Sequence, residues 1–174
     1  EVRAFLLGCI HELRRDRQKG VVVQFSATEF DPDVMDFVKI GQGSIGGKAR
    51  SLAFMSALLQ EHPEIQEKFL EINIEIPKTL VIATDGFEAF VSENHLEHFV
   101  REDFTDEEVT EGFLKADMPE WLIGELEAYL SQVKYPLSVR SSSLLEDAQF
   151  QPYAGLYETY MIPNNHPDFS LRLK

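Results

Sequence analysis

The sequence predicts an α+β fold in which a mixed sheet is flanked by helices. Helical patterns and short apolar runs both occur along the 174 residues, without strict strand–helix alternation. This order favours an α+β domain over a doubly wound parallel sheet. Hydrophobic residues make up 44% of the chain and include 13 Phe, which is enough apolar material for a packed core.

Residues 1–36 are predicted to form an N-terminal helical arm that precedes a domain at 37–174. Apolar residues recur at helical spacing through residues 2–18, and basic residues gather toward the end of this stretch. A short apolar run that can form a strand follows, and residues 26–36 are polar and acidic, as expected of a connector.

Local signals then define the elements of the domain. Thr105 and Glu108 match a capping box, Pro119 suits the first turn of a helix, and Thr84 or Asp85 is expected to cap another helix. Period-two alternation or apolar runs predict strands at 37–40, 72–76, 79–83, 137–141 and 157–162. Helices are expected at 48–60, from 84 or 85 to 91, after 105, and at 119–133. The apolar face expected on the first of them consists of Leu52, Met55, Leu58 and Leu59.

Charge and composition restrict the class of partner. The chain has 16 basic and 30 acidic residues and a net charge of −14, so nucleic acid and anionic membranes are not expected partners. The single cysteine, Cys9, lies on an apolar stripe and is interpreted as a buried hydrophobe. Neither a membrane-spanning run nor a signal peptide is recognisable, which predicts a cytoplasmic protein. Both ends are interpreted as cuts in a longer protein.

A glycine-rich loop at 41–47 is the first candidate site. Residues 41–46 match G-x-G-x-x-G, but the second strand and acidic residue of a dinucleotide site are missing, and Gln42 and Ala49 break the P-loop pattern. An anion site remains, because glycines expose backbone N–H groups, and a helix N-terminus and Lys48 add positive charge. The alternative is a flexible turn with a solvated lysine.

Arg140, within the predicted strand at 137–141, is the second candidate. Strand alternation places Ser138, Arg140 and Ser142 on one face, and a guanidinium between hydroxyls suits a phosphate. Burial of an arginine in an apolar strand would require an anionic partner. The alternative is therefore a structural ion pair with Glu146 or Asp147.

Residues 154–159 are the third candidate, since small residues there lead into a strand whose Thr159 can bind a ligand. A tight turn into an edge strand explains the same pattern. The five histidines have no metal-ligand spacing, so no zinc site is expected.

Four segments, in order, together resemble the nucleotide-binding domain of the phosphoenolpyruvate synthase and pyruvate phosphate dikinase family. Gly46-Gly47-Lys48-Ala49 with Leu52 is similar to G-G-K-x-x-x-L, and residues 76–84 are similar to V-P-x-G-F-x-I-T-T. Residues 139–147 are similar to V-R-S-S-A-x-x-E-D, and residues 154–159 to A-G-Q-Y-E-T. Thr79 replaces the glycine of the second motif, and Leu156 replaces the glutamine of the fourth.

The resemblance implies the first subdomain of an ATP-grasp domain and an ATP site. It places Lys48 and Arg140 on the phosphates, as the candidate catalytic residues. The nucleotide-binding set that it implies is Gly46, Gly47, Lys48, Arg140, Ser141, Gly155 and Thr159. It also implies Mg²⁺, whose ligands and the adenine pocket are expected outside this chain, so no metal ligand is assigned here.

The implied activity is ATP-dependent phosphorylation of a histidine, followed by phosphoryl transfer to pyruvate on other domains of a full-length phosphotransferase. A homodimer is the assembly that the resemblance suggests for that full-length protein. This chain alone is expected to be inactive. Two alternatives stay open: a degenerate ATP-grasp module with a binding or regulatory role, and a related dikinase with a different acceptor.

Overall fold

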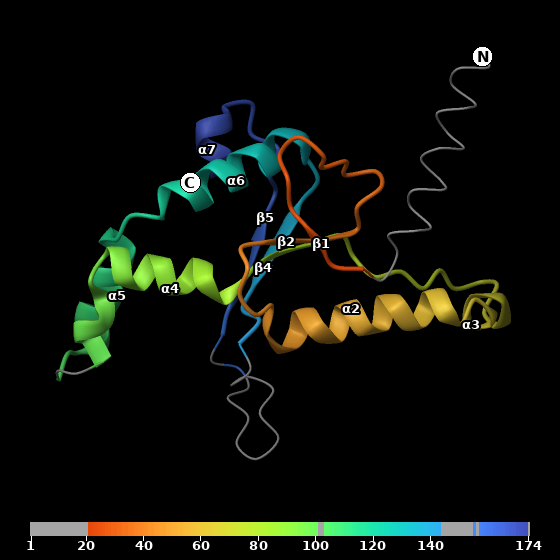
Figure 1. Ribbon diagram of the computed structural model, residues 1–174, viewed down its shortest axis with the longest axis horizontal. Helices are drawn as coiled ribbons and strands as arrows, with labels where there is room; N and C mark the ends of the chain where they lie inside the picture. The colour runs from red at the N-terminus through yellow and green to blue at the C-terminus, as the bar shows by residue number, and fades with distance from the viewer. Residues whose placement is uncertain (1–20, 101–102, 144–154, 156, 174) are drawn as a thin grey trace.

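The computed structural model describes residues 21–100, 103–143, 155 and 157–173 (Figure 1). The predicted helix at 2–18 and Cys9 lie outside these residues. The described elements are β1 (Val23–Gln24), β2 (Phe37–Ile40), α2 (Gly46–Glu61), α3 (Glu64–Lys68), β3 (Thr79–Ile82), α4 (Thr84–Glu93), the 3-10 helix η1 (Leu96–Val100), α5 (Asp106–Lys115), α6 (Glu120–Gln132), β4 (Leu137–Arg140), β5 (Thr159–Ile162) and α7 (Phe169–Leu173).

A three-stranded parallel sheet, in the order β1-β2-β3, forms the centre of the structure. Helix α2 lies below this sheet and helices α6 and α7 lie above it in Figure 1. Strand alternation divides the apolar side chains between the two faces. Val38 and Ile40 belong to the core cluster with Leu122 and Leu130 of α6, whereas Phe37 and Val81 pack with Ala49 of α2.

The segment before β2 is built into this core. β1 pairs with β2, and Phe25, Phe30 and Val34 are all buried. Phe25 and Phe30 stack near Tyr129 of α6, with ring centroids 5.1 to 6.1 Å apart. Burial, and then a hydrogen bond with the Tyr135 hydroxyl, raise the pKa of the Tyr129 hydroxyl above its usual value. Residues 21–36, which the sequence assigned to an arm and a connector, therefore contribute to the core of the domain.

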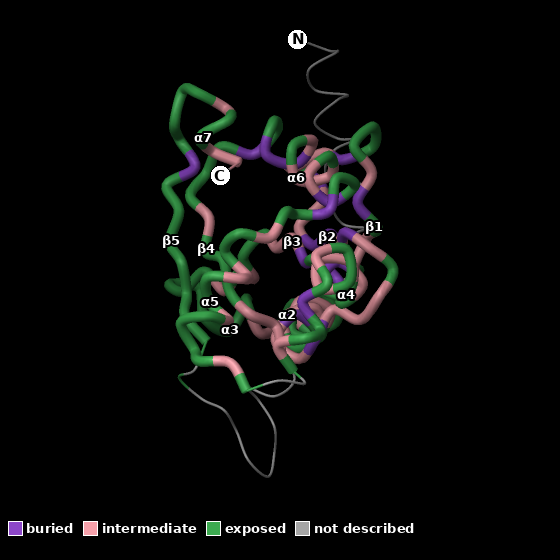
Figure 2. The backbone as a smooth tube through the Cα atoms, turned by 90° about the vertical axis from the view of Figure 1, so that its left-hand side faces the viewer, coloured by how far each residue is buried: buried purple, intermediate pink, exposed green. Residues whose placement is uncertain are grey.

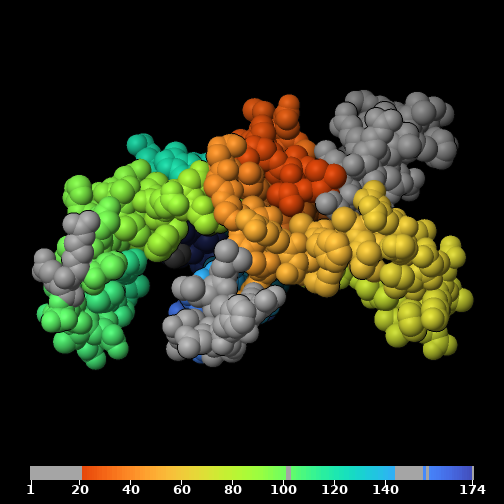
Figure 3. Space-filling model, turned by 60° about the horizontal axis from the view of Figure 1, so that its bottom comes forward, coloured from red at the N-terminus to blue at the C-terminus, as the bar shows by residue number. Residues whose placement is uncertain are grey.

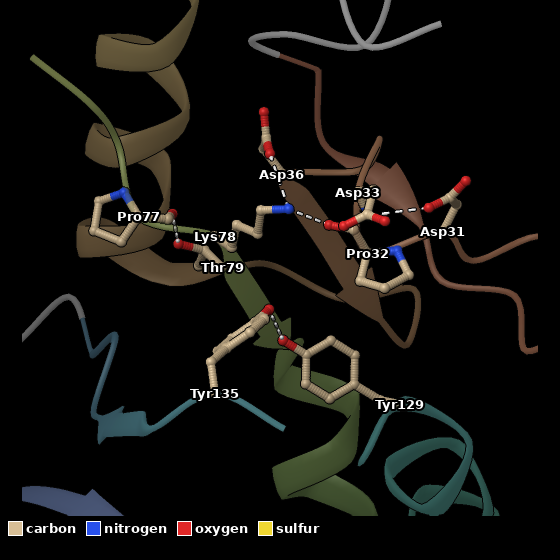
Figure 4. Close-up of polar contacts among 9 residues, drawn as sticks. All are labelled: Asp31, Pro32, Asp33, Asp36, Pro77, Lys78, Thr79, Tyr129 and Tyr135. Carbon is tan, nitrogen blue, oxygen red and sulfur yellow. Dashed lines mark hydrogen bonds and ion pairs between the residues drawn. The ribbon is translucent and has the colours of Figure 1, made fainter. Parts of the chain in front are cut away.

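Lys78 fastens this segment to the start of β3 (Figure 4). Its ammonium group donates to the carbonyl oxygen of Pro32 and lies 3.9 Å from a carboxylate oxygen of Asp36. The backbone N–H of Thr79 also donates to the carbonyl of Asp36, at 2.8 Å. The beginning of β3 is thus held against the chain that leads into β2.

The second sheet is an antiparallel pair, β4 and β5, in which Leu137 lies opposite Ile162 and Arg140 opposite Thr159. The two strands run side by side along one edge of the molecule, apart from β1–β3 (Figure 2). Only Leu137 is more than half-covered and packs against the main core; the remaining residues of both strands are exposed. The predicted mixed sheet is therefore two separate sheets, one parallel and one antiparallel.

Helices α4 and α5 form a lobe with η1 that projects on the opposite side from the α2–α3 end (Figure 3). Phe90, Phe99, Phe104 and Phe113 make tilted and edge-on ring contacts inside this lobe, with centroids 4.8 to 6.1 Å apart. The predicted capping box is present at the start of α5, where Thr105 and Glu108 bond reciprocally.

Two local expectations are wrong. The alternating isoleucines at 72–76 form no strand, and β3 begins only at Thr79; this segment is instead held by Gln66, whose amide bonds to Ile72 and Ile74. On α2, the predicted apolar face is only partly used, because Met55 and Leu58 are exposed. Leu52 and Ala53 face the core with Ala49.

A polar network closes the C-terminal end of α6. Asn164 is 3% exposed, and its amide nitrogen donates to the carbonyls of Val133 and Tyr135 at 3.0 and 3.1 Å. Its oxygen accepts from Arg172, which also donates to the carbonyls of Leu130 and Val133. These contacts satisfy carbonyls that a helix end leaves without partners.

We expect Asn164→Gly to lower the free energy of unfolding by about 1–3 kcal/mol, because buried carbonyls and Arg172 lose their partner. Glycine is the informative replacement because the backbone at Asn164 has φ +51°, which glycine adopts without strain. Urea unfolding measures the change, and Asn165→Gly, at an exposed neighbour, is the control. Equal effects at both positions would contradict the assigned role.

Candidate functional site

Three segments that lie far apart in sequence meet at the glycine-rich loop. The loop connects β2 to α2; the junction of β3 and α4 lies against it on one side, and the residues after β4 contact it where α2 begins. Hydrogen bonds across 40 to 97 positions of sequence hold the three together. The structure therefore brings the first two predicted motifs into contact.

The junction of β3 and α4 binds the first half of the loop. Asp85 accepts from the backbone N–H groups of Gln42 and Gly43, at 2.7 and 3.0 Å, one through each carboxylate oxygen. The hydroxyl of Thr84 accepts from the N–H of Ser44 at 3.1 Å, and the N–H of Thr84 donates to the carbonyl of Ser44 at 2.9 Å. Four hydrogen bonds thus join residues 42–44 to residues 84–85.

Ser142 binds the second half of the loop. Its carbonyl accepts from the N–H of Gly47 at 3.0 Å, and its hydroxyl accepts from the N–H of Ala49 at 3.1 Å. The same hydroxyl donates to the carbonyl of Ile45 at 2.8 Å. A residue two positions beyond Arg140 therefore supplies acceptors that the first turn of α2 lacks within its own helix.

The glycines of the loop are required by these internal contacts. Gly41 and Gly46 have φ of +89° and +76°, a region that side chains other than glycine rarely adopt. A Cβ atom would lie 2.4 Å from the Asp85 carboxylate at Gly41, 2.5 Å from the Thr84 hydroxyl at Gly43 and 1.9 Å from the Ser142 carbonyl at Gly46. All three close approaches are to the protein itself.

The sequence predicted that the loop N–H groups would be available for an anion, but most of them already have acceptors. Besides the four N–H groups bound by Asp85, Thr84 and the Ser142 carbonyl, the N–H of Gly46 lies 3.4 Å from the hydroxyl of Ser44. That hydroxyl also accepts from Arg50 at 2.7 Å. Most of the loop N–H groups that were expected to be open to an anion are thus bound by acceptors of the protein itself.

Asp85 binds two of the loop amides through a charged side chain. Its hydrogen bonds with Gln42, and then with Gly43, lower the pKa of its carboxyl below the usual value, while burial opposes the shift. The N–H groups of Gln42 and Gly43 and the first turn of α4 all favour the ionised form of the Asp85 carboxyl. The carboxylate therefore acts as an internal anion for this loop.

The cationic candidates lie at the edges of this junction. Lys48 is the third residue of α2 and is half-buried, one position before the amide that binds Ser142. Arg140 is the last residue of β4, lies opposite Thr159 of β5 and is exposed. Because Arg140 is exposed, the requirement of a buried arginine for an anionic partner does not apply to it.

The other predicted site residues lie near the same end of the hairpin. Ser141 follows β4 and its hydroxyl accepts from the N–H of Ser143 at 3.1 Å. Gly155 is exposed with φ +82°, and no atom lies within 4 Å of a Cβ built there. Glu146, Asp147, Ala154 and Leu156 lie outside the described residues.

Sequence reasoning missed the roles of Thr84, Asp85 and Ser142. It placed Thr84 or Asp85 as the cap of α4, but Ala83 occupies the N-cap position and no side chain bonds there. The side chains of both residues bond to the loop instead. Their position directly after β3, at the same edge as the end of β2, was the available signal.

Two hollows of the described surface lie away from the cationic pair. A shallow one of about 550 Å³ is lined by Asp85 and by residues of α4 and η1, and one of about 620 Å³ lies between α2 and residues 73–78. Neither is lined by Lys48 or Arg140. Within the described ranges, no group of three or more His, Cys, Asp or Glu side chains could hold a metal ion. No described helix is both long and apolar enough to cross a membrane.

The described residues form an α+β fold in which the glycine-rich loop contacts both the start of α4 and the end of β4. Residues 42–170 match the family model described as pyruvate phosphate dikinase, AMP/ATP-binding domain. The chain belongs to this family, as the four sequence motifs indicated. The comparisons with curated proteins and with solved structures gave no match.

We expect Gly46→Ala to lower the free energy of unfolding by about 2 kcal/mol or more, because a methyl group would overlap the Ser142 carbonyl at a strained φ. Gly124→Ala is the matched control, since no atom lies within 4 Å of its Cβ position in α6. That control should be neutral or stabilising by about 0.5–1 kcal/mol. Similar unfolding curves for both variants would contradict the packing described at Gly46.

A second prediction concerns Asp85 and pH. A lowered carboxyl pKa means that the stabilisation is complete above the ordinary pKa of aspartate, near 4, and is lost as pH falls through the lower folded-state value. Asp85→Asn should therefore cost about 1–2 kcal/mol at pH 7, and its difference from wild type should shrink below about pH 4.

Chemical denaturation at several pH values measures this difference, with Glu88→Gln on the exposed face of α4 as the control. A difference that is independent of pH would show that Asp85 does not bind the loop as a carboxylate.

Proposed function

We propose that this chain is the ATP-binding part of a phosphoenolpyruvate synthase-like phosphotransferase. In the full-length protein, ATP would phosphorylate a histidine, and the phosphoryl group would then pass to pyruvate. The observation that carries the proposal is the family match over residues 42–170. The contact between the G-G-K segment and the end of the V-R-S-S strand supports it, since both segments are expected at the phosphates.

Lys48 and Arg140 are assigned to the triphosphate in this proposal. Catalysis of phosphoryl transfer depends largely on positioning and on stabilising the charge of the transferred group. Arg140 can offer a planar fork of donors to two phosphate oxygens, whereas Lys48 offers a point charge. Because the chain as a whole carries a net charge of −14, such cations would have to act locally.

The remaining predicted residues would surround these two. Gly46 and Gly47 open α2, Ser141 follows Arg140, and Thr159 lies opposite Arg140 on β5. Gly155 would form the turn that leads back into β5. Mg²⁺ belongs to the proposal as the partner of ATP, and we assign it no ligand among the described residues. A cytoplasmic homodimer with pyruvate bound on other domains completes the proposal.

A second candidate is a module that keeps this fold but binds or regulates without phosphotransfer. The occupied N–H groups of the glycine-rich loop favour it, because they leave fewer backbone donors for phosphates. A dikinase with a different acceptor is a further form of the first proposal, and the acceptor would be bound outside these residues.

We expect Arg140→Ala to lower ATP-dependent histidine phosphorylation in the full-length protein by roughly 10²-fold or more, as for the loss of one preorganised electrostatic contact. Arg140→Lys should restore only part of this activity, because it keeps the charge and loses the fork. The melting temperature should not change, since Arg140 is exposed and no hydrogen bond or ion pair joins its guanidinium to another described residue.

Transfer of labelled γ-phosphate from ATP measures the activity, and Lys134→Ala, at an exposed cation before β4, is the control. Normal phosphotransfer in Arg140→Ala would remove Arg140 from the site. A wild-type protein that binds ATP without phosphorylating any histidine would favour the binding module.

A further inference from the structure

The N–H groups of Gln42 and Gly43 lie where a G-x-G loop would receive a phosphate, and both are bound by Asp85. The neighbouring N–H of Ser44 is bound by Thr84. A phosphate could reach these donors only by replacing side chains that already bind them. Two outcomes of nucleotide binding are therefore possible. Either α4 moves away and the phosphate takes these N–H groups, or α4 stays in place and the phosphate is bound by other groups.

The space between the loop and α4 is too small for a phosphate. A single methyl group added at Gly43 would lie 2.5 Å from the Thr84 hydroxyl and 2.8 Å from the backbone nitrogen of Asp85. At Gly41 it would lie 2.4 Å from the Asp85 carboxylate. A phosphate group is larger than a methyl group, so its entry would require the start of α4 to move away from the loop.

Several contacts oppose such a movement. The N–H of Thr84 bonds to the Ser44 carbonyl, and the N–H of Ala83 bonds to the carbonyl of Ile40 at 2.9 Å. Gly86, in the first turn of α4, is buried against Ile82 and Leu122. The start of α4 is therefore fixed to the sheet and the core, and two charge-assisted hydrogen bonds would be lost if Asp85 left.

We propose that Asp85 is a positioning residue of the nucleotide site: it keeps the Gln42 and Gly43 N–H groups while ATP is bound, so that the phosphates are bound by cationic side chains and not by those amides. This inference rests on the proposed ATP-binding function. Through residues 42–44 and the turn that follows, Asp85 fixes the start of α2, and with it the position of Lys48. The nearby Arg50 contributes through the Ser44 hydroxyl.

The first test is ATP affinity, measured by calorimetry on the full-length protein as wild type, Asp85→Asn and the control Glu88→Gln, at a temperature where each variant is folded. Asp85→Asn should bind ATP at least 10-fold more weakly, and Glu88→Gln should bind as wild type does. Tighter binding by Asp85→Asn would mean that the carboxylate competes with phosphate, and would overturn the proposal. Unchanged affinity with a lower melting temperature would overturn it too, because Asp85 would then be merely structural.

The second test needs no variant at Asp85. In the nuclear magnetic resonance spectrum of the full-length wild-type protein, the amide signals of Gln42 and Gly43 should follow the ionisation of a carboxyl group whose pKa is below that of ordinary aspartate. This titration should persist in millimolar ATP while the side-chain signal of Arg140 shifts. If ATP abolishes the titration, the phosphate has replaced Asp85 and the proposal is wrong.

The two proposals fail in different ways. A full-length wild-type protein that binds no ATP contradicts the proposed function and the positioning role together. A wild type that binds ATP, with an Asp85→Asn variant that binds it equally well, contradicts only the role of Asp85.

Discussion

The arrangement of the domain depends on how the N–H groups of one glycine-rich loop are satisfied. Backbone donors rarely remain without acceptors, and this loop has few partners of its own because it lies between a strand and the first turn of a helix. Asp85 supplies acceptors from the start of α4, and Ser142 supplies them from the end of β4. The same contacts that complete the loop therefore attach the α4–α5 lobe and the β4–β5 hairpin to the parallel sheet.

Features determined by neighbouring residues could be predicted well from the sequence. The strand at 37–40, the helix that follows it and the capping box at Thr105 depend on periodicity and on contacts within one turn. The family was also identifiable, because four short motifs in a fixed order restrict the choice far more than any single one. The glycine-rich segment and the V-R-S-S segment do lie in contact, while their role as one phosphate site stays a prediction.

Features that depend on distant partners could not be predicted. Thr84 and Asp85 are residue types that commonly cap helices. Their side-chain oxygens instead accept hydrogen bonds from backbone N–H groups 40 to 43 positions earlier in the chain. The alternation at 72–76 suits a strand, but β3 pairs with β2 only from Thr79, and β2 has β1 on its other edge. β1 in turn depends on a short segment whose composition resembled a connector. In each case the contact that determines the structure is with a residue far away in the sequence, so a local sequence pattern cannot indicate it.

The G-G-K segment carries two kinds of constraint that the sequence alone cannot separate. Glycine indicates that another group approaches the backbone closely, but it does not identify that group. At Gly46 the approaching group is the Ser142 carbonyl, so this glycine is explained by the fold alone. Arg140 is different, because an exposed arginine at the end of a strand contributes little to packing. In the proposed function, the phosphates of ATP account for this cation, whereas the protein itself accounts for the glycine. On this proposal, the side chains of Lys48 and Arg140, which flank the loop, provide the specificity for phosphate. The loop itself serves to hold these side chains in position.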